Sequence, residues 1–336
     1  MSETVRIGIN GFGRIGRCTF KQLLKRDDVR AVGINDLADP GDLAYLLKYD
    51  SVHGWYPEKV SRTEDSLVVG DREIPFFSEE DPSSISWGDV GADVVIESTG
   101  AFRDRDRAAG HLRDGVKRVV ISAPSDNADG TFVLGVNGDD YDPERHVVVS
   151  MASCTTNCLA PVAKILHREF GLEHLMMSTV HAYTSSQSLM DIPMRKRRRG
   201  RSAAVSIVPT TTGAAKATEL VLPELEGRMD GMAFRVPVPD GSVVDLVASL
   251  NTDVTAESVN RALREASREK ELAGILRVTD EALVSRDILG DPHSSIVDAE
   301  STMVLRDRIV KIVAWYDNEW GYSARLADFA VRVARS

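Results

Sequence analysis

VRIGINGFGRIG, at residues 5–16, joins a strand-like apolar run to three closely spaced glycines. In a turn from strand to helix, the first glycine of this spacing allows a tight bend, and the second lets a pyrophosphate approach the backbone. The third lets the helix pack closely on the strand, and the N-terminus of that helix favours an anion. Gly11, Gly13 and Gly16 hold these positions, so the stretch predicts a dinucleotide-binding turn.

Asp36 lies where such a turn needs a carboxylate. It follows a second strand-like run and stands twenty residues after Gly16. At this spacing a carboxylate accepts hydrogen bonds from the hydroxyls of the adenosine ribose. The same charge would repel the additional phosphate of NADP, so the sequence favours NAD and leaves NADP as the less favoured alternative. An ordinary turn residue is the other interpretation of Asp36.

The chain changes character near its middle. The clearest strand-like runs of the first part are residues 5–10, 31–35, 93–98, 117–122 and 146–150. Their alternation with helical segments predicts an α/β fold with a Rossmann-type doubly wound parallel sheet. Longer alternating runs follow at residues 177–183 and 231–250 and predict an α+β domain with a mostly antiparallel sheet. An amphipathic segment at 319–335 predicts a terminal helix.

These patterns predict two domains. Residues 1–153 and 317–336 would form the dinucleotide-binding domain, with the C-terminal helix returning to it. Residues 154–316 would form the second domain. With 336 residues and 43% hydrophobic composition, the chain is long enough to bury a core in each.

The composition favours a cytoplasmic protein. No apolar run is long enough to span a membrane, and the N-terminus lacks the apolar core of a signal peptide. Three cysteines are too few for a secreted disulfide framework. A net charge of −10 opposes non-specific binding to nucleic acids or anionic membranes, so we expect no membrane partner.

Cys154 is the candidate nucleophile. Ser153 is suited to cap the helical segment that follows, which would place Cys154 in the first turn, where the helix dipole favours a thiolate. The dipole contributes only about 1 kcal/mol, less than one pKa unit, so an imidazole must assist. His181, in the next long strand-like run, is the best-placed histidine. A buried structural cysteine and a core histidine are the alternatives that these residues leave open.

Cys154 and Cys158 would also share one face of a helix, which amounts to half of a metal site. No second Cys/His pair with suitable spacing follows in the sequence. We therefore expect no metal and interpret Cys158 as structural.

Several blocks along the chain extend these observations. They are NGFGRIGR (10–17), LKYDSVHG (47–54), ESTG (97–100), ISAP (121–124), SCTTNC (153–158), TGAAKA (212–217) and WYDNE (315–319). In sequence and in order, these blocks resemble the phosphorylating glyceraldehyde-3-phosphate dehydrogenase family over essentially the whole chain. The resemblance implies NAD-dependent oxidation of D-glyceraldehyde 3-phosphate with inorganic phosphate to 1,3-bisphosphoglycerate, a step of glycolysis and gluconeogenesis. It also implies a homotetramer.

The resemblance assigns the chemistry to Cys154 and His181. Cys154 would attack the aldehyde and carry the thioester that phosphate then cleaves, while His181 activates the thiol. The cofactor contacts that the resemblance implies lie beside the three glycines and near the C-terminus: Arg14 and Ile15 at the pyrophosphate, Asp36 at the ribose, Ser122 at the adenosine side, Asn318 at the nicotinamide amide and Tyr322 beside the nicotinamide.

Two anion pockets are implied in the same way. Thr184 and Arg235 resemble the pocket for the phosphate of the substrate. The pocket for the attacking phosphate would contain Ser153, Thr155, Thr212 and Gly213. Arg199 best matches the arginine that the family has in this pocket, and Arg201 is the alternative.

Both of these arginines belong to RKRRRGR, the basic run from Arg195 to Arg201. In the family this segment reaches a neighbouring subunit. Its density of positive charge exceeds what one phosphate pocket needs, so a second, polyanion- or nucleic-acid-binding activity is an alternative of another class.

Two other enzymes are alternatives. Erythrose-4-phosphate dehydrogenase shares the thiol and the cofactor, whereas aspartate-semialdehyde dehydrogenase should lack the pocket made by Thr184 and Arg235. The sequence departs from the family pattern at Glu80, where many relatives carry arginine, and in the loop at residues 237–242. Ile192-Pro193 resembles the Leu-Pro of members that prefer NAD, in agreement with the argument from Asp36.

Overall fold

The computed structural model describes residues 4–336, which form two compact units. The first unit comprises the chain up to Phe132, Asp140–Ala152 and Ser323–Ser336, and the second comprises Val133–Asp139 and Ser153–Tyr322. This division differs from the expected domain boundaries at Val133–Asp139 and by a few residues before the C-terminal segment. Residues 1–3, which belong to the N-terminal segment expected to lack a signal peptide, lie outside the described residues.

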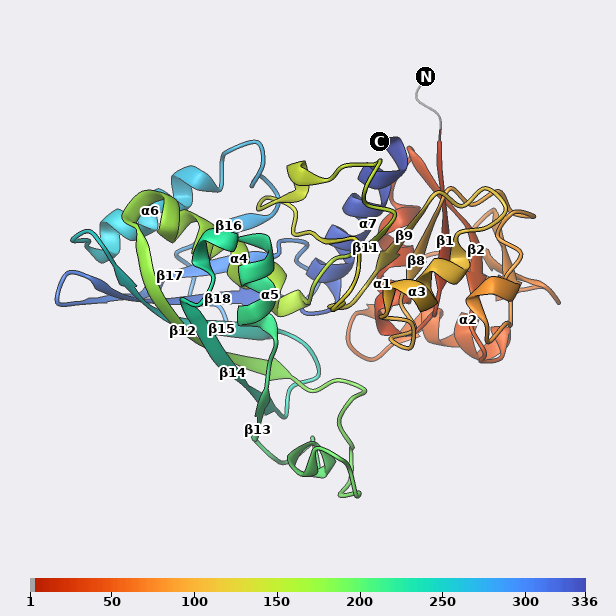
Figure 1. Cartoon of the computed structure of the whole chain (residues 1–336). Helices are drawn as coiled ribbons and strands as arrows, with labels where there is room; N and C mark the ends of the chain where they lie inside the picture. Colours follow the sequence, from red (N-terminus) through yellow and green to blue (C-terminus); the bar gives the residue numbers. More distant parts are fainter. Residues whose placement is uncertain (1–3) are drawn as a thin grey trace. The chain divides into compact units, whose positions relative to one another are not determined.

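A mostly parallel sheet organises the first unit (Figure 1). Within residues 4–336 it has nine strands in the order β10-β11-β9-β8-β1-β2-β7-β6-β5. All neighbours from β10 to β7 are parallel, and only β7, β6 and β5 pair antiparallel. The strands are β1 (Val5–Asn10), β2 (Val29–Asn35), β5 (Val60–Arg62), β6 (Ser66–Val69), β7 (Arg72–Phe77), β8 (Val94–Glu97), β9 (Arg118–Ile121), β10 (Gly130–Thr131) and β11 (Val148–Ser150).

The remaining elements of this part of the chain are helices and one small hairpin. They are α1 (Arg14–Leu24), α2 (Pro40–Lys48), β3 (Tyr49–Asp50) with β4 (Gly54–Trp55), η1 (Pro82–Ser84), α3 (Arg105–Ala108), η2 (Ala109–His111) and η3 (Gly138–Asp140). α7 (Trp320–Arg335) ends the chain. Because β1 and β2 are parallel, their carboxyl ends, Asn10 and Asn35, lie at one edge of the sheet, where nucleotides bind in such folds.

The second unit is built on a mostly antiparallel sheet. Between Val133 and Tyr322 its order is β13-β14-β12-β15-β18-β17-β16, with only β12 and β14, and β16 and β17, in parallel pairs. The strands are β12 (Leu172–Ala182), β13 (Val208–Thr211), β14 (Met229–Val236), β15 (Ser242–Leu250), β16 (Leu276–Thr279), β17 (Ser295–Leu305) and β18 (Ile309–Tyr316). The helices are α4 (Cys154–Phe170), η4 (Arg197–Gly200), α5 (Ala214–Val221), η5 (Pro223–Leu225) and α6 (Ala256–Ala266).

The predicted fold class is confirmed. The alternating run at residues 231–250 forms two strands, β14 and β15, which lie on opposite sides of β12. Pro237 and Pro239 interrupt the run, because proline has no N–H to donate to a sheet. No helix within the described residues is long and apolar enough to cross a membrane.

Candidate active site

The turn after β1 is shaped for an approaching anion. Gly11 has a φ of +89°, and a Cβ there would lie 2.6 Å from the backbone nitrogen of Thr99. A Cβ on Gly16 would lie 2.1 Å from the carbonyl oxygen of Gly11, so both positions need glycine. Gly13, the N-cap of α1, instead has open space at its Cβ position. The turn therefore leaves room for a ligand against the first N–H groups of α1, which have no partner within the helix.

The Asp36 carboxylate, which is expected to bind the ribose, also stabilises this turn through hydrogen bonds to backbone N–H groups. Its Oδ2 accepts a hydrogen bond from the Phe12 N–H at 2.7 Å, and its Oδ1 accepts from the Ala38 N–H at 3.1 Å. An ionised carboxylate has about four acceptor positions, so these two bonds leave capacity for ribose hydroxyls.

Two asparagines that the sequence analysis missed join the strand ends beneath the turn. Asn35 Nδ2 donates to Asn10 Oδ1 at 2.7 Å and to the Glu79 carbonyl at 3.0 Å, and Asn10 Nδ2 donates to Glu97 Oε2 at 2.5 Å. Asn10, Asn35 and Glu97 are all buried. The sequence contained a signal for this contact: Asn10 and Asn35 stand at the carboxyl ends of two neighbouring parallel strands. Buried polar groups need partners, so two asparagines in these positions are expected to bond to each other.

Three further predicted nucleotide contacts, Arg14, Ile15 and Ser122, lie in the first unit. Arg14 and Ile15 begin α1, but the Arg14 guanidinium donates to Asp50 at 2.9 Å. The backbone N–H of Arg14 lies in the first turn of α1, where a pyrophosphate is expected. Ser122 directly follows β9 and is half-buried, with its N–H bonded to the Glu97 carbonyl at 2.9 Å.

Cys154 is the first residue of α4, and the predicted cap is confirmed. Ser153 has extended backbone, and its Oγ accepts a hydrogen bond from the Thr156 N–H at 3.0 Å. Cys154 is half-buried, while Cys158, one turn later, is fully buried, with its Sγ 3.6 Å from the Ser295 hydroxyl. The two cysteines therefore differ in access to solvent, although they share a helix.

His181 lies beside the thiol. Its Nε2 is 3.5 Å from Cys154 Sγ, and its Nδ1 is 2.7 Å from the Ala182 carbonyl oxygen. A proton on Nδ1 satisfies that carbonyl and leaves the Nε2 lone pair directed at the sulfur. This is the tautomer that accepts a proton from the thiol.

Burial opposes charge on both members of this pair. It raises the pKa of the Cys154 thiol above its ordinary value, against the effects of Arg235 and of the Thr155 hydroxyl and N–H, which lower it. Burial, and then the nearby charge of Arg235, lower the pKa of His181 to about 3. The sequence predicts that the helix terminus and an imidazole set the pKa of Cys154. This prediction is incomplete, because desolvation has the largest effect on that pKa. A proton passing from Sγ to Nε2 would create two charges that stabilise each other at 3.5 Å.

Arg235 and Thr184, the predicted substrate-phosphate residues, lie next to the imidazole. Arg235 Nη1 donates to the Ala182 carbonyl at 2.8 Å and to the Thr184 hydroxyl at 3.4 Å, and lies 3.0 Å from His181 Nδ1. Residues 181 and 235 are direct partners in the parallel pairing of β12 and β14. The sheet register therefore brings these two side chains together.

The two candidate arginines of the second pocket have different partners. Arg201 is exposed and forms an ion pair with Asp191 at 2.9 Å. Arg199 is half-buried and donates to the Thr210 hydroxyl at 2.9 Å, and its charge acts on both His181 and Arg235. The geometry therefore favours Arg199 as the arginine near the thiol.

Thr212 and Gly213 lie directly before α5. The Thr212 hydroxyl accepts a hydrogen bond from the Ala214 N–H at 3.2 Å, and the Cβ position of Gly213 is open. Thr155 was expected to offer its hydroxyl to the attacking phosphate. The structure differs: Thr155 is buried, and its hydroxyl is bonded to the Tyr316 hydroxyl at 2.8 Å. Tyr316 also bonds Thr179 at 2.9 Å, a role that no local sequence pattern indicated.

Asn318 and Tyr322 are both buried in the second unit, close to the start of α7. Asn318 accepts a hydrogen bond from Ser242, the first residue of β15. The pKa of Tyr322 is raised well above its ordinary value, first by burial and then by Cys154, so its phenol stays protonated.

The loop at residues 237–242, which departs from the family pattern, contributes Asp240 to a buried pair of carboxyl groups with Asp317. Burial, together with Asp317, raises the pKa of Asp240 to about 9, and the two side chains are hydrogen-bonded. Asp240 therefore keeps its proton near neutral pH, where it can donate to the neighbouring carboxylate. Glu80 is exposed, and the structure gives no explanation for the departure from arginine at this position.

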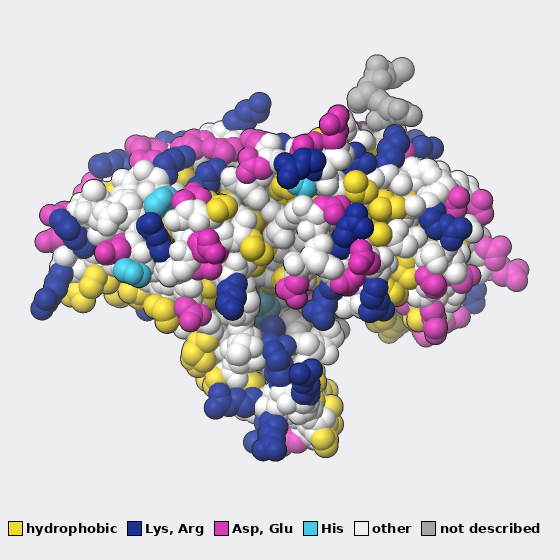
Figure 2. Space-filling view, in the orientation of Figure 1, with side chains coloured by type: hydrophobic (Ala, Val, Ile, Leu, Met, Phe, Trp, Pro, Cys, Tyr) yellow, Lys and Arg dark blue, Asp and Glu magenta, His cyan; other side chains and the backbone are white. Residues whose placement is uncertain are grey.

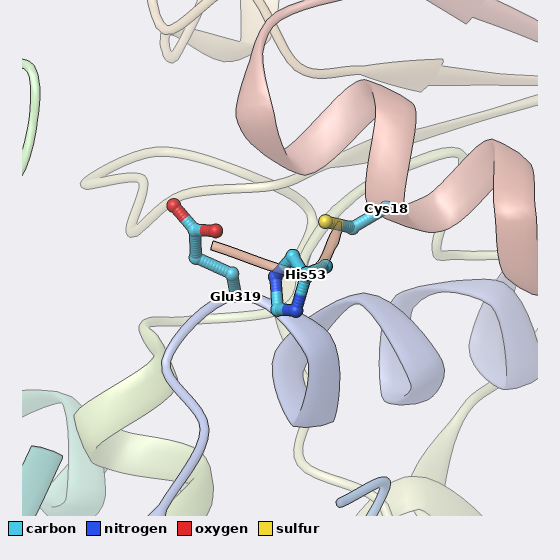
Figure 3. Close-up of side chains that lie close together, drawn as sticks. All are labelled: Cys18, His53 and Glu319. Atoms are coloured by element: carbon cyan, nitrogen blue, oxygen red, sulfur yellow. The ribbon is translucent and has the colours of Figure 1, made fainter. Parts of the chain in front are cut away.

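A possible metal ligand pair also occurs in the first unit. Figure 3 shows Cys18 on α1 with the His53 imidazole, and their ligand atoms lie within 4.8 Å of each other. Cys18 is buried, and two ligands fall short of the four that a structural zinc site uses. Cys154 and His181 likewise form a pair, so they suit nucleophilic chemistry better than metal binding.

Comparisons with known proteins agree with this geometry. Residues 5–105 match the family described as "Glyceraldehyde 3-phosphate dehydrogenase, NAD binding domain", and residues 153–318 match its "C-terminal domain". The chain is 56% identical over 330 residues to the glyceraldehyde-3-phosphate dehydrogenase of Geobacillus stearothermophilus, covering 98% of each chain. It is 52% identical over 331 residues to that of Streptomyces coelicolor, again covering 98% of each chain. The chain therefore belongs to the glyceraldehyde-3-phosphate dehydrogenase family.

Proposed function

We propose that the chain is an NAD-dependent, phosphorylating glyceraldehyde-3-phosphate dehydrogenase of glycolysis and gluconeogenesis. It oxidises D-glyceraldehyde 3-phosphate with inorganic phosphate to 1,3-bisphosphoglycerate. The single observation that carries this proposal is the 3.5 Å contact between Cys154 Sγ and His181 Nε2 at the start of α4, in a member of this family.

The first unit fits NAD. The open space at Gly13, the first N–H groups of α1 at Arg14 and Ile15, and the carboxylate of Asp36 match a pyrophosphate and a ribose. Ser122 is proposed for the adenosine side, and Asn318 and Tyr322 of the second unit for the nicotinamide. Bound NAD supplies the acceptor for the hydride that the aldehyde carbon loses.

Cys154 and His181 carry the bond changes. Nε2 takes the thiol proton while Sγ forms a bond to the aldehyde carbon, whose oxygen becomes negative. The first N–H groups of α4 and the protonated imidazole stabilise that oxygen. After oxidation, Cys154 holds a thioester; a phosphate oxygen then bonds to the acyl carbon, and the C–S bond breaks to return a thiolate.

The anion pockets would orient the two phosphates. Arg235 and Thr184 suit the substrate's own phosphate, because one guanidinium and one hydroxyl lie together beside His181. The attacking phosphate would be held by Arg199 with the pocket residues Ser153, Thr155, Thr212 and Gly213. Thr155 would contribute through its N–H, since its hydroxyl is bonded to Tyr316.

A first prediction separates the two arginines. Arg199→Ala should raise the KM for inorganic phosphate by about tenfold to a hundredfold, the effect of one charged hydrogen bond. Arg201→Ala should change it less than about twofold, because Arg201 is exposed and already paired with Asp191. Steady-state rates at varied phosphate measure both. A larger effect in Arg201→Ala would reverse the assignment.

The proposed function predicts a strict requirement for phosphate. With glyceraldehyde 3-phosphate and NAD, removal of inorganic phosphate should stop turnover after one equivalent per thiol, because the thioester has no acceptor. Fast multiple turnover without phosphate would indicate a hydrolytic aldehyde dehydrogenase instead. Repeating the assay with erythrose 4-phosphate and with NADP tests the alternative substrate and cofactor; a higher kcat/KM for erythrose 4-phosphate would overturn the substrate assignment.

A homotetramer in the cytoplasm is part of the proposal. Exposed apolar side chains from adjacent strands of the second unit's sheet support self-association: Met176, Met232, Val247, Met303 and Ile309. A groove of about 340 Å³ runs among several of them. Apolar patches of this kind are typical of protein interfaces. Light scattering at several concentrations gives the oligomeric state.

The basic run supports a second candidate activity, binding of a polyanion. Arg195, Arg197 and Arg198 are exposed, and Figure 2 shows Lys and Arg side chains gathered over the segment that carries η4. Salt-dependent retention of RNA that is lost when these three arginines are neutralised, and unchanged in Cys154→Ser, would support this activity. Absence of retention at low salt would remove it.

A further inference from the structure

The Ser242 hydroxyl connects two parts of the second unit that carry proposed functional residues. Ser242 is fully buried at the start of β15. Its Oγ accepts a hydrogen bond from the Ala182 N–H at 3.1 Å and donates one to Asn318 Oδ1. Ala182 directly follows His181 and accepts a bond from its Nδ1. One hydroxyl therefore joins the strand end that holds the imidazole to the segment that holds Asn318.

The two bonds determine which way the Asn318 amide points. A serine hydroxyl has a single proton to donate. Because the Ala182 N–H already donates to Oγ, that proton is directed to Asn318, which must turn its Oδ1 toward Ser242. The reversed amide would direct a second donor at the same oxygen and remove the acceptor of the Ser242 proton. In a buried setting this loss is unfavourable, and both residues are buried.

The orientation leaves the other end of the amide to a ligand. Asn318 Nδ2 makes no hydrogen bond to any residue in the described range 4–336. It presents N–H donors, which match a carbonyl oxygen and not an amino group. We propose that Ser242 is a positioning residue that fixes the Asn318 amide to donate to the carboxamide oxygen of the nicotinamide. The inference rests on the proposed cofactor role of Asn318.

A separate contact holds the backbone of the same two segments. Asp240, two residues before Ser242, is hydrogen-bonded to Asp317, directly before Asn318. The Asp317 carboxylate also accepts from the Gly290 N–H at 2.7 Å and from two N–H groups at the start of α7. Removing the Ser242 hydroxyl should therefore release the amide of Asn318 without releasing the segment itself.

Comparing two ligands tests the proposal without using activity. Calorimetric titration of Ser242→Ala should show about a threefold to tenfold weaker affinity for NAD, the effect of one hydrogen bond. ADP-ribose, which lacks the nicotinamide, should bind within about twofold of the wild type. Ser249→Ala is the matched control, because Ser249 lies on the same strand with its Oγ 3.5 Å from His174. It should bind both ligands normally.

The double variant distinguishes positioning from general damage. Once Asn318 is replaced by alanine, Ser242→Ala should have no further effect on NAD affinity, since it acts through Asn318. Equal weakening of NAD and ADP-ribose, or a full additional loss in the double variant, would overturn the inference. If Ser242→Ala does not fold, Ser242→Cys keeps the volume with a weaker donor, and should show the same selective loss for NAD.

Failure of this inference differs from failure of the proposed function. Wild-type protein that binds NAD and oxidises glyceraldehyde 3-phosphate, together with a Ser242→Ala variant of normal NAD affinity, would remove only the role of Ser242. Wild-type protein that binds ADP-ribose but neither binds NAD more tightly nor oxidises the aldehyde would remove the proposed function.

Discussion

Cys154→Ser is expected to lower kcat/KM for glyceraldehyde 3-phosphate by at least about 10⁴-fold, as loss of a catalytic nucleophile generally does. A serine hydroxyl is far less acidic than a thiol, so His181 would not generate an alkoxide at neutral pH. The oxygen would also form no thioester, and the acyl group would have no leaving group of low pKa when phosphate attacks. Steady-state assays at saturating NAD and phosphate measure this loss.

Binding of NAD should survive the same change. The glycine turn, Asp36 and the first N–H groups of α1 belong to the first unit, and none of them includes Cys154. Titration should therefore give an NAD affinity within about threefold of the wild type. A serine variant that retains more than about one per cent of the wild-type rate would refute the thioester mechanism.

Cys158→Ser supplies the matched control for this experiment. Cys158 lies on the same helix, but its sulfur is fully buried and contacts Ser295 and the Ala314 carbonyl. We expect this variant to keep the reaction with one equivalent of iodoacetamide per chain, because Cys154 remains. Loss of that reaction in Cys158→Ser, with retention in Cys154→Ser, would show that the wrong thiol has been assigned.

Local sequence rules predicted the parts of the site that depend on local geometry. The positive φ of Gly11, the open space at Gly13 and the cap of α4 by Ser153 each follow from a few neighbouring residues. The α/β class followed from the alternation of strands and helices. The break within residues 231–250 also follows from the sequence, since Pro237 and Pro239 lie in the loop between β14 and β15.

The features of the site that the sequence did not predict depend on contacts between residues far apart in the chain. The Thr155 hydroxyl meets Tyr316, which is 161 positions away, so sequence spacing gave no reason to withdraw it from the phosphate pocket. The choice between Arg199 and Arg201 likewise depends on partners, Thr210 for one and Asp191 for the other. Desolvation of Cys154 and His181 was also invisible, because burial of one side chain depends on the packing of many others.

His181→Asn is expected to slow aldehyde oxidation by about 10²-fold to 10⁴-fold, the usual contribution of a general base. Its diagnostic effect is on the thiol. In the wild type, burial raises the pKa of Cys154 and lowers that of His181, so each group alone stays neutral near pH 7. Proton transfer across the 3.5 Å contact changes both groups together, and the resulting thiolate is stabilised by the imidazolium and by Arg235.

Asparagine retains a polar side chain but accepts no such proton. The thiol of His181→Asn must then ionise into solvent against the full effect of burial, with only Arg235 and the start of α4 to assist. Burial raises the pKa of Cys154, and in this variant no imidazolium offsets that effect, so the rate of alkylation by iodoacetamide should rise at a higher pH than in the wild type. An alkylation profile that coincides with that of the wild type would mean that His181 does not share the thiol proton, and the 3.5 Å contact would then be structural rather than catalytic.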